Sequence, residues 1–401
     1  MKKRYLTSIP FLLMANLWSD DYALLSSEKQ ELLRQQQGIY ESEYEKLRYN
    51  WISPINLIGN YTYDKNAMGT SSDTESVSAS FSQDIFRSGG ITYQIAYADA
   101  NKEAKSILHQ QNIANLNLQL LNALLNYEKS RYQVEQSAKR IANYEIEVFI
   151  KRQQFDAGKT DITELNNALM NKSSELKTHA SLKYALILQR QEIAKLSNID
   201  PDTFALPRFE LVEKEKYISN QWDIQYANTQ SKTLSYLYEV TKSNYLPSVA
   251  VNGSIGYQNY NSKDAALGYN GHYYSGGVSL TIPFTYNASA TVQEARATYL
   301  QEAATIADKR RELEASYAQS IALIDSYHET INLISENLKL YDELINATKA
   351  GVDAGTKTGY DLQTLTNTKA IEEYDLKINA IKIQMELANL HFALKTSKDN
   401  L

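Results

Sequence analysis

Few side chains in this 401-residue sequence are spaced for catalysis or metal binding. The histidines are scattered without metal-ligand spacing or a paired nucleophile, at His109, His179, His272, His328 and His391. The pairs Gly89-Gly90 and Gly276-Gly277 lack the lysine of a phosphate-binding loop and the spacing of a dinucleotide-binding loop. Cysteine is absent, which excludes disulfides, thiolate metal sites and an acylated cysteine. We therefore expect no enzyme activity, no metal and no cofactor.

Two acidic residues are placed where a helix stabilises negative charge. The segment Asp156-Ala157-Gly158-Lys159-Thr160 recurs as Asp353-Ala354-Gly355-Thr356-Lys357, and each copy interrupts a very long helical pattern. Glu164 and Asp361 follow these glycine turns and would occupy the first turn of the next helix, near the positive end of its dipole. Helix stabilisation alone is a sufficient explanation of both acids.

The charge pattern and the N-terminus narrow the class of protein. The formal net charge is -6 with both signs interleaved, so nucleic-acid binding is not expected. Lys2-Lys3-Arg4 precede a mostly apolar run from Tyr5 to Trp18, which predicts a signal peptide over 1–20, the alternative being an ordinary buried segment. No later stretch reaches the roughly 18 uncharged apolar residues of a membrane helix. If this chain spans a membrane, it must do so with strands.

The second half of the chain repeats the first at an offset of about 193 to 199 residues. This predicts a first repeat over 21–197, a linker over 198–218 and a second repeat over 219–398. Each repeat reads helix, strand pair, very long helix, helix. The predicted strands cover 50–63, 74–87, 246–260 and 273–286, and the helices after them cover 91–155, 160–197, 288–352 and 358–398.

The strands alternate between apolar and polar residues over about ten positions, the length that a tilted strand needs to cross a bilayer. Four such strands cannot close alone, because an open edge in lipid leaves backbone groups unpaired. We expect several chains to share one barrel with a polar lumen. Tyrosines near the predicted strand ends would form its aromatic girdle: Tyr61, Tyr63, Tyr257, Tyr260, Tyr273, Tyr274 and Tyr286. A soluble sandwich with tyrosine-rich edges is the alternative.

The helical segments carry sustained heptads, clearest from Leu313 to Ile345 and from Ile371 to Phe392, which predict coiled-coil packing. Each of the two longest helices has about 65 residues and would be about 98 Å long. No compact domain accommodates such a helix. Two shorter helices stacked end to end would pair with each long one.

This order of elements resembles the TolC-like family of outer-membrane efflux proteins along nearly the whole chain. The resemblance is most specific at the two turns, Gly158 with Ile162-Thr163-Glu164-Leu165 and Gly355 with Tyr360-Asp361-Leu362. It implies a homotrimer whose twelve strands form one barrel in the outer membrane, continuous with a long antiparallel coiled-coil tunnel that crosses the periplasm. It also implies a periplasmic adaptor and an inner-membrane transporter as partners.

The resemblance further places the turns at the periplasmic mouth, where helix pairs swing to open the channel and the adaptor docks. The tip residues would be Gly158, Lys159, Thr160, Gly355, Thr356 and Thr358. Three-fold repetition would convert Glu164 and Asp361 into rings of like charge that attract cations. Lys357 would bridge to such an acid and hold the mouth closed.

The mouth departs from the family pattern at three positions. Thr364 replaces a second acid that family members often carry one turn after Asp361, Lys357 replaces an arginine, and Val352 replaces a tyrosine. These replacements predict a weaker acidic ring and a looser lock.

Two other functions remain open. In the first alternative, the chain is a non-conducting coiled-coil tether of the cell envelope. In the second, it is a general porin, but the long helices argue against this because a porin needs no periplasmic reach.

Overall fold

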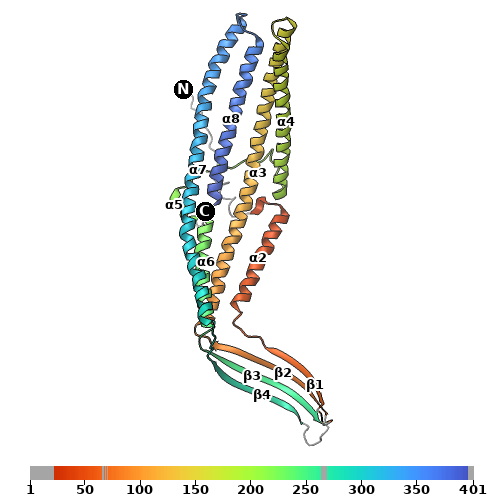
Figure 1. Cartoon of the computed structure of the whole chain (residues 1–401), viewed down its shortest axis with the longest axis vertical. Coiled ribbons are helices and arrows are strands. Elements are labelled where there is room, and N and C mark those ends of the chain that lie inside the picture. The colour runs from red at the N-terminus through yellow and green to blue at the C-terminus, as the bar shows by residue number, and fades with distance from the viewer. Residues whose placement is uncertain (1–21, 66, 68, 70, 263–268, 396–401) are drawn as a thin grey trace, which may run out of the picture. The chain divides into compact units, whose positions relative to one another are not determined.

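The computed structural model describes residues 22–395 except 66, 68, 70 and 263–268, so the predicted signal peptide lies outside the described residues. The chain is mostly helical with one four-stranded sheet (Figure 1), which confirms the expected mixture of α and β structure. Within the described part, no helix combines the length and apolarity needed to cross a bilayer. The elements are η2 (Tyr22–Leu24), α2 (Ser27–Arg48), β1 (Asn56–Lys65), β2 (Ser71–Phe86), α3 (Gly90–Asp156), α4 (Ile162–Leu196), α5 (Lys214–Asn220), α6 (Trp222–Ser243), β3 (Ser248–Ser262), β4 (Tyr269–Thr281), α7 (Ala288–Asp353) and α8 (Gly359–Phe392).

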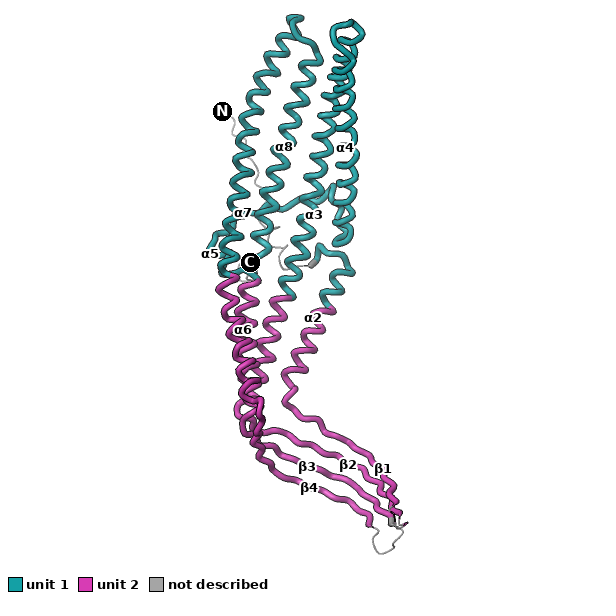
Figure 2. The backbone as a smooth tube through the Cα atoms, in the orientation of Figure 1, with its two compact units in different colours: residues 1–34, 109–222, 310–401 teal, residues 35–108, 223–309 magenta. Residues whose placement is uncertain are grey.

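The chain forms two compact units (Figure 2). Unit 1 consists of residues 1–34, 109–222 and 310–401, and unit 2 consists of residues 35–108 and 223–309. Unit 2 therefore holds the sheet, and unit 1 holds both glycine turns and the helices that flank them.

In unit 2 the strands pair antiparallel in chain order, β1-β2-β3-β4. Within the described residues, no strand pairs with the outer edge of β1 or of β4. Two glycines of β3 lie beneath aromatic rings. A Cβ placed on Gly253 would lie 2.5 Å from the Phe81 ring, and one on Gly256 would lie 2.6 Å from the Tyr273 ring. Each ring thus covers the backbone that the glycine, which has no side chain, leaves exposed. Such a contact helps to fix strand register.

Three strand boundaries differ from the expected ones because proline cannot donate a ladder hydrogen bond. β3 begins at Ser248, directly after Pro247, and not at 246. β1 begins at Asn56 and not at 50, since residues 49–52 form turns and Pro54 precedes the strand. β4 begins at Tyr269 and ends at Thr281, whereas a strand over 273–286 was expected. Pro283 follows its end.

Unit 1 contains two helical hairpins, α3 with α4 and α7 with α8, except for the first parts of α3 and α7, which belong to unit 2. On α7 the buried side chains Leu313, Ile324 and Ile334 lie on the predicted heptads. On α8 the prediction holds only in part, because Ile378, Ala388 and Phe392 are buried on the predicted heptads, whereas Ile383, Leu387 and Leu390 are buried outside them. The α3/α4 hairpin adds polar links. Ser137 donates to Glu175 at 2.5 Å, and Lys172 lies 3.0 Å from Glu145. Apolar burial is the main stabilising contribution in both hairpins.

The helix expected to begin near residue 219 is two helices, because Gln221 is extended and separates α5 from α6. Gln221 forms an antiparallel bridge with Leu394, and the backbone N–H of Trp222 donates to Ala393 O at 3.0 Å. The indole N–H of Trp222 donates to Phe392 O at 3.1 Å. The same pairing ends α8 at Phe392, although a helix to 398 was expected. Sequence periodicity does not show this contact, because its partners are about 170 residues apart.

Candidate functional site

Both glycine turns of unit 1 end a long helix in the same way. Gly158 has φ 67° and Gly355 has φ 74°, a left-handed conformation that favours glycine. Lys159 N–H donates to Gln154 O at 2.8 Å, and Thr356 N–H donates to Gly351 O at 2.8 Å. Each bond joins residues five positions apart, as in a Schellman cap. Nothing lies within 4 Å of a Cβ placed on either glycine, so backbone conformation and not space requires them.

The helix after each turn begins with a side-chain cap. Asp161 accepts hydrogen bonds from the N–H groups of Thr163 at 2.9 Å and Glu164 at 3.0 Å. Thr358 accepts from Asp361 N–H at 3.2 Å, and the Asp361 carboxylate accepts from Thr358 N–H at 2.9 Å, which completes a capping box. Asp161 was not among the residues predicted from the sequence. The pattern Asp-x-x-Glu at a helix start was the signal that could have found it.

The Asp361 carboxylate is held in its charged form. Hydrogen bonds from the backbone and hydroxyl of Thr358 lower the pKa of Asp361 below its ordinary value, and the positive charge of Lys357 lowers it further. Asp361 therefore combines two roles, as a cap of α8 and as a fixed negative charge at the tip.

The ion pair near these turns differs from the expected one. Lys151, on α3, lies 2.8 Å from Glu164, whereas among the described residues Lys357 has no carboxylate within 4.0 Å. The expected bridge between Lys357 and an acid is thus not formed within the described chain and stays a prediction for the assembled mouth. Lys151 was missed because it lies one turn and a half before a helix end, with no local pattern that points to α4.

A groove of about 550 Å³ joins the two hairpins next to the turns. It brings together three of the four predicted gate residues, Lys357, Asp361 and Thr364, and it also contains Lys151. Glu164 is joined to the groove through Lys151. The remaining lining residues are Asn143, Tyr144, Ile146, Glu147, Ile150, Thr348 and Leu365.

Asn143 connects α3 to α8 at this groove. Its side-chain N–H₂ donates to Thr364 O at 3.4 Å and to Thr368 Oγ1 at 3.2 Å, and its carbonyl accepts from Asn367 Nδ2 at 3.0 Å. Thr364, which replaces an expected acid, thus contributes its backbone carbonyl to the contact between the hairpins.

In unit 2 the sheet has one apolar and one polar face. The register places Leu57, Ala79, Ile255 and Tyr274 opposite one another, with Val77 and Val278 on the same face. These apolar residues are mostly exposed in the single chain, Leu57 by 80% and Val278 by 72%. An apolar surface of this extent indicates contact with lipid or protein.

The opposite face carries hydroxyl and amide groups that bond across the strands. Ser82 donates to Asn252 at 2.8 Å, Asn252 donates to Ser279 at 3.3 Å, and the hydroxyls of Ser254 and Ser275 lie 2.8 Å apart. This face suits water, as in the lumen of a barrel.

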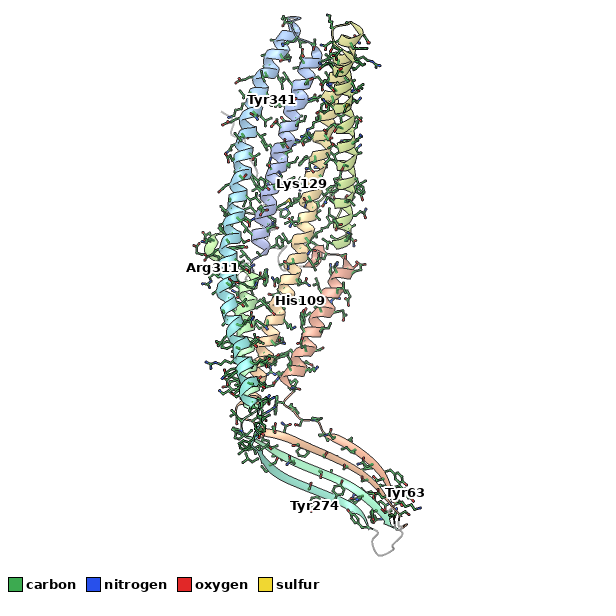
Figure 3. The ribbon with its side chains drawn as sticks, viewed as in Figure 1. Tyr63, His109, Lys129, Tyr274, Arg311 and Tyr341 are labelled. Atoms are coloured by element: carbon green, nitrogen blue, oxygen red, sulfur yellow. The ribbon has the colours of Figure 1, made fainter. Side chains whose placement is uncertain are left out.

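Four of the predicted girdle tyrosines lie on the apolar face, and three do not. Tyr61, Tyr63, Tyr257 and Tyr274 share it, and Figure 3 labels Tyr63 and Tyr274. Tyr260 pairs with Thr74 and Tyr273 pairs with Gly256, so both lie on the polar face. Tyr286 lies beyond the end of β4. A girdle on the apolar face would leave out Tyr260 and Tyr273, because the expectation rested on nearness to strand ends without a known register, and the place of Tyr286 stays a prediction.

Among the described residues, no group of three or more histidine, aspartate or glutamate side chains could hold a metal ion. The features that remain are therefore the tip groove, the two caps and the two-faced sheet.

Known protein structures share the fold that carries these features. The solved structures similar to this chain include the outer membrane protein VceC from Vibrio cholerae, with a TM-score of 0.72 and 14% identity over 92% of this chain and 93% of that one. They also include the Campylobacter jejuni CmeC outer membrane channel, with a TM-score of 0.71 and 13% identity over 96% and 87%. A membrane protein from Pseudomonas aeruginosa matches with a TM-score of 0.67 and 16% identity over 96% and 93%.

At such low identities, the TM-scores show a likeness of fold alone. No curated protein matches the chain by sequence. The model of the outer membrane efflux protein family matches residues 32–198 and 215–373, which is most of the chain. The resemblance noted at the glycine turns is thereby confirmed, and the chain belongs to the outer membrane efflux protein family.

Proposed function

We propose that this chain is one protomer of a trimeric exit duct, which passes substrates from an inner-membrane transporter and a periplasmic adaptor through the outer membrane. The observation that carries the proposal is the sheet of unit 2. It has an apolar face, a polar face and two outer edges that no other described strand pairs with. In lipid those edges must be paired, and copies of the same sheet would pair them.

Three copies would supply twelve strands, with Leu57, Val77 and Val278 toward lipid and the serine and asparagine groups toward water. Purified protein in a planar bilayer is then expected to give stable single-channel currents. A non-conducting tether would give none, and that result would refute the duct.

The absence of cysteine makes the strand pairing directly testable. A cysteine at Asn60 of β1 would be combined with one at Gly271, Tyr273, Ser275 or Gly277 of β4. Within one chain these strands are three spacings of about 4.8 Å apart, too far for a disulfide. We expect one of the four combinations to give covalent products up to the trimer. Products larger than three chains, or no product from any combination, would contradict a shared trimeric barrel.

We place the gate at the tip of unit 1. Asp361 and Glu164 would each recur three times around the mouth and attract cations, and the turn residues Lys159, Thr160 and Thr356 would face the adaptor. The lowered pKa of Asp361 supports a ring that stays charged at physiological pH.

The variant Asp361→Asn tests the ring, because asparagine keeps a side-chain acceptor for the α8 cap while removing the charge. The ratio of cation to anion permeability is expected to fall. Unchanged selectivity in channels of normal conductance would show that Asp361 only caps its helix. Thr364→Asp, which adds an acid one turn further along α8, is expected to raise the same ratio.

A further inference from the structure

The contact between α3 and α8 in unit 1 contains a series of polar side chains at heptad spacing. Asn122 donates to Asn389 Oδ1 at 3.2 Å, and Gln136 donates to Ile371 O at 3.2 Å. Asn143 bonds to α8 at the groove described above. On α3 these residues are separated by one or two steps of seven, so they lie on one stripe of the helix.

Lys129, labelled in Figure 3, lies on the same stripe of α3, seven residues after Asn122 and seven before Gln136. The same step taken backward along α8 from Asn389 reaches Lys382. Because the helices are antiparallel, Lys129 and Lys382 face each other at this level. The positive charge of Lys382 acts on Lys129, in agreement with that placement, and burial together with this charge lowers the pKa of Lys129.

Each of the two lysines belongs to the same short motif. Asn126 accepts from Lys129 Nζ at 2.6 Å, and Asn379 accepts from Lys382 Nζ at 3.2 Å. The motif Asn-x-x-Lys thus occurs on both helices, and the two copies are related by the local two-fold symmetry of an antiparallel pair. Asn379 is buried, and both lysines are half-buried.

No carboxylate compensates these two charges within the described chain, where neither ammonium has an acid within 4.0 Å. Three other half-buried lysines of unit 1 have acidic partners. Lys151 and Lys172 both pair with glutamates, and Lys369 pairs with Asp342. Lys382 lies 5.2 Å from the Tyr327 ring centroid, a contact that stabilises one ammonium but leaves the repulsion between the two.

We propose that the paired Asn-x-x-Lys motifs of α3 and α8 form a binding site for an oxyanion, either free inorganic phosphate or the phosphate group of a larger solute. Two ammonium groups on facing helices would each donate a charge-assisted hydrogen bond, and the bound anion would cancel their repulsion. The site is independent of the proposed gate, because it shares no residue with the groove.

The test is equilibrium dialysis of the full-length protein in detergent against radiolabelled inorganic phosphate, at constant ionic strength in chloride. We expect one phosphate per chain. Lys129→Met and Lys382→Met are each expected to weaken binding at least about tenfold, since each removes one charge-assisted hydrogen bond. Lys129→Arg is expected to retain binding.

Lys369→Met is the matched control, because it removes a half-buried lysine of α8 that already has an acidic partner. Its phosphate binding is expected to be unchanged. Both methionine variants are expected to assemble as the wild type does, since each removes a repulsion. Binding that persists in the double variant Lys129→Met, Lys382→Met would overturn the site, as would an equal loss in Lys369→Met.

Competition with a phosphate monoester then identifies the source of the anion. Displacement of phosphate supports a site open to the phosphate group of a larger solute. Failure to displace it supports a site for the free ion.

Discussion

Asn143 is the residue whose loss tests most directly how the two hairpins of unit 1 are joined at the tip. The variant Asn143→Ala removes three hydrogen bonds between α3 and α8 at once. It also leaves the amide of Asn367, only 7% exposed, without its acceptor. The apolar contacts inside each hairpin are untouched.

The expected effect follows from the number of bonds and their exposure. A protein hydrogen bond contributes about 1 kcal/mol net, so three bonds contribute about 3 kcal/mol. Asn143 is half-buried, and water will replace part of what is lost, which leaves about 2 kcal/mol. Such a change raises the equilibrium constant for local separation of α8 from α3 about 30-fold.

Hydrogen exchange measures this equilibrium constant. Amides of residues 364–368 are expected to exchange about 30-fold faster in Asn143→Ala, while amides in the middle of α7 keep their rates. Asn122→Ala is the control, because it removes a single bond to Asn389 at another level of the same contact. Unchanged exchange at 364–368, or an equal increase caused by Asn122→Ala, would refute the argument that Asn143 holds the tip together.

Three further predictions concern charge, pH and backbone conformation. Lys151→Gln frees the Glu164 carboxylate and is expected to raise cation selectivity in bilayers with little change in stability. The double variant Lys151→Gln, Glu164→Gln is expected to have a lower cation selectivity than the single variant. Burial, aided by the charge of Lys216, lowers the pKa of His391. The unfolded chain therefore binds the proton first, so unit 1 is expected to be fully stable above about pH 6.5 and to lose stability as the pH falls from there to the folded-state pKa of His391. His391→Phe should remove this dependence of stability on pH, as pH-dependent proteolysis would show. Gly158→Ala is expected to cost about 1–2 kcal/mol through its left-handed φ alone, and Gly90→Ala to cost more because its Cβ would overlap a serine of α6, as denaturation midpoints would show.

Helix and strand identity could be predicted from the sequence because periodicity is a local signal. Alternation of apolar and polar residues indicated the strands, and heptads indicated the buried residues of α7 such as Leu313 and part of those of α8, such as Ile378. The glycine turns could be predicted for the same reason. A left-handed residue followed by a capped helix is encoded within about ten residues.

The features that could not be predicted all depend on partners distant in sequence. The break at Gln221 exists because Leu394 pairs with it, and nothing near either residue shows this. The face on which Tyr260 and Tyr273 lie depends on register, which a shift of one residue reverses. Lys151 could not be identified as the partner of Glu164 because long, flexible lysine side chains pair with whichever acid the packing presents.

The strand order of the sheet has a consequence for how the chain folds. Each hairpin of unit 1 closes through a turn of a few residues, so its contacts are local and can form early. The central pairing of the sheet joins β2 to β3 across 170 residues at Ser82 and Asn252, and across 188 residues at Asp73 and Asn261. Contacts of such high order form slowly, so the two β-hairpins would exist separately for a time with exposed apolar faces and four open edges instead of two. The stage at which this protein is most exposed to aggregation is therefore the interval before its two halves meet.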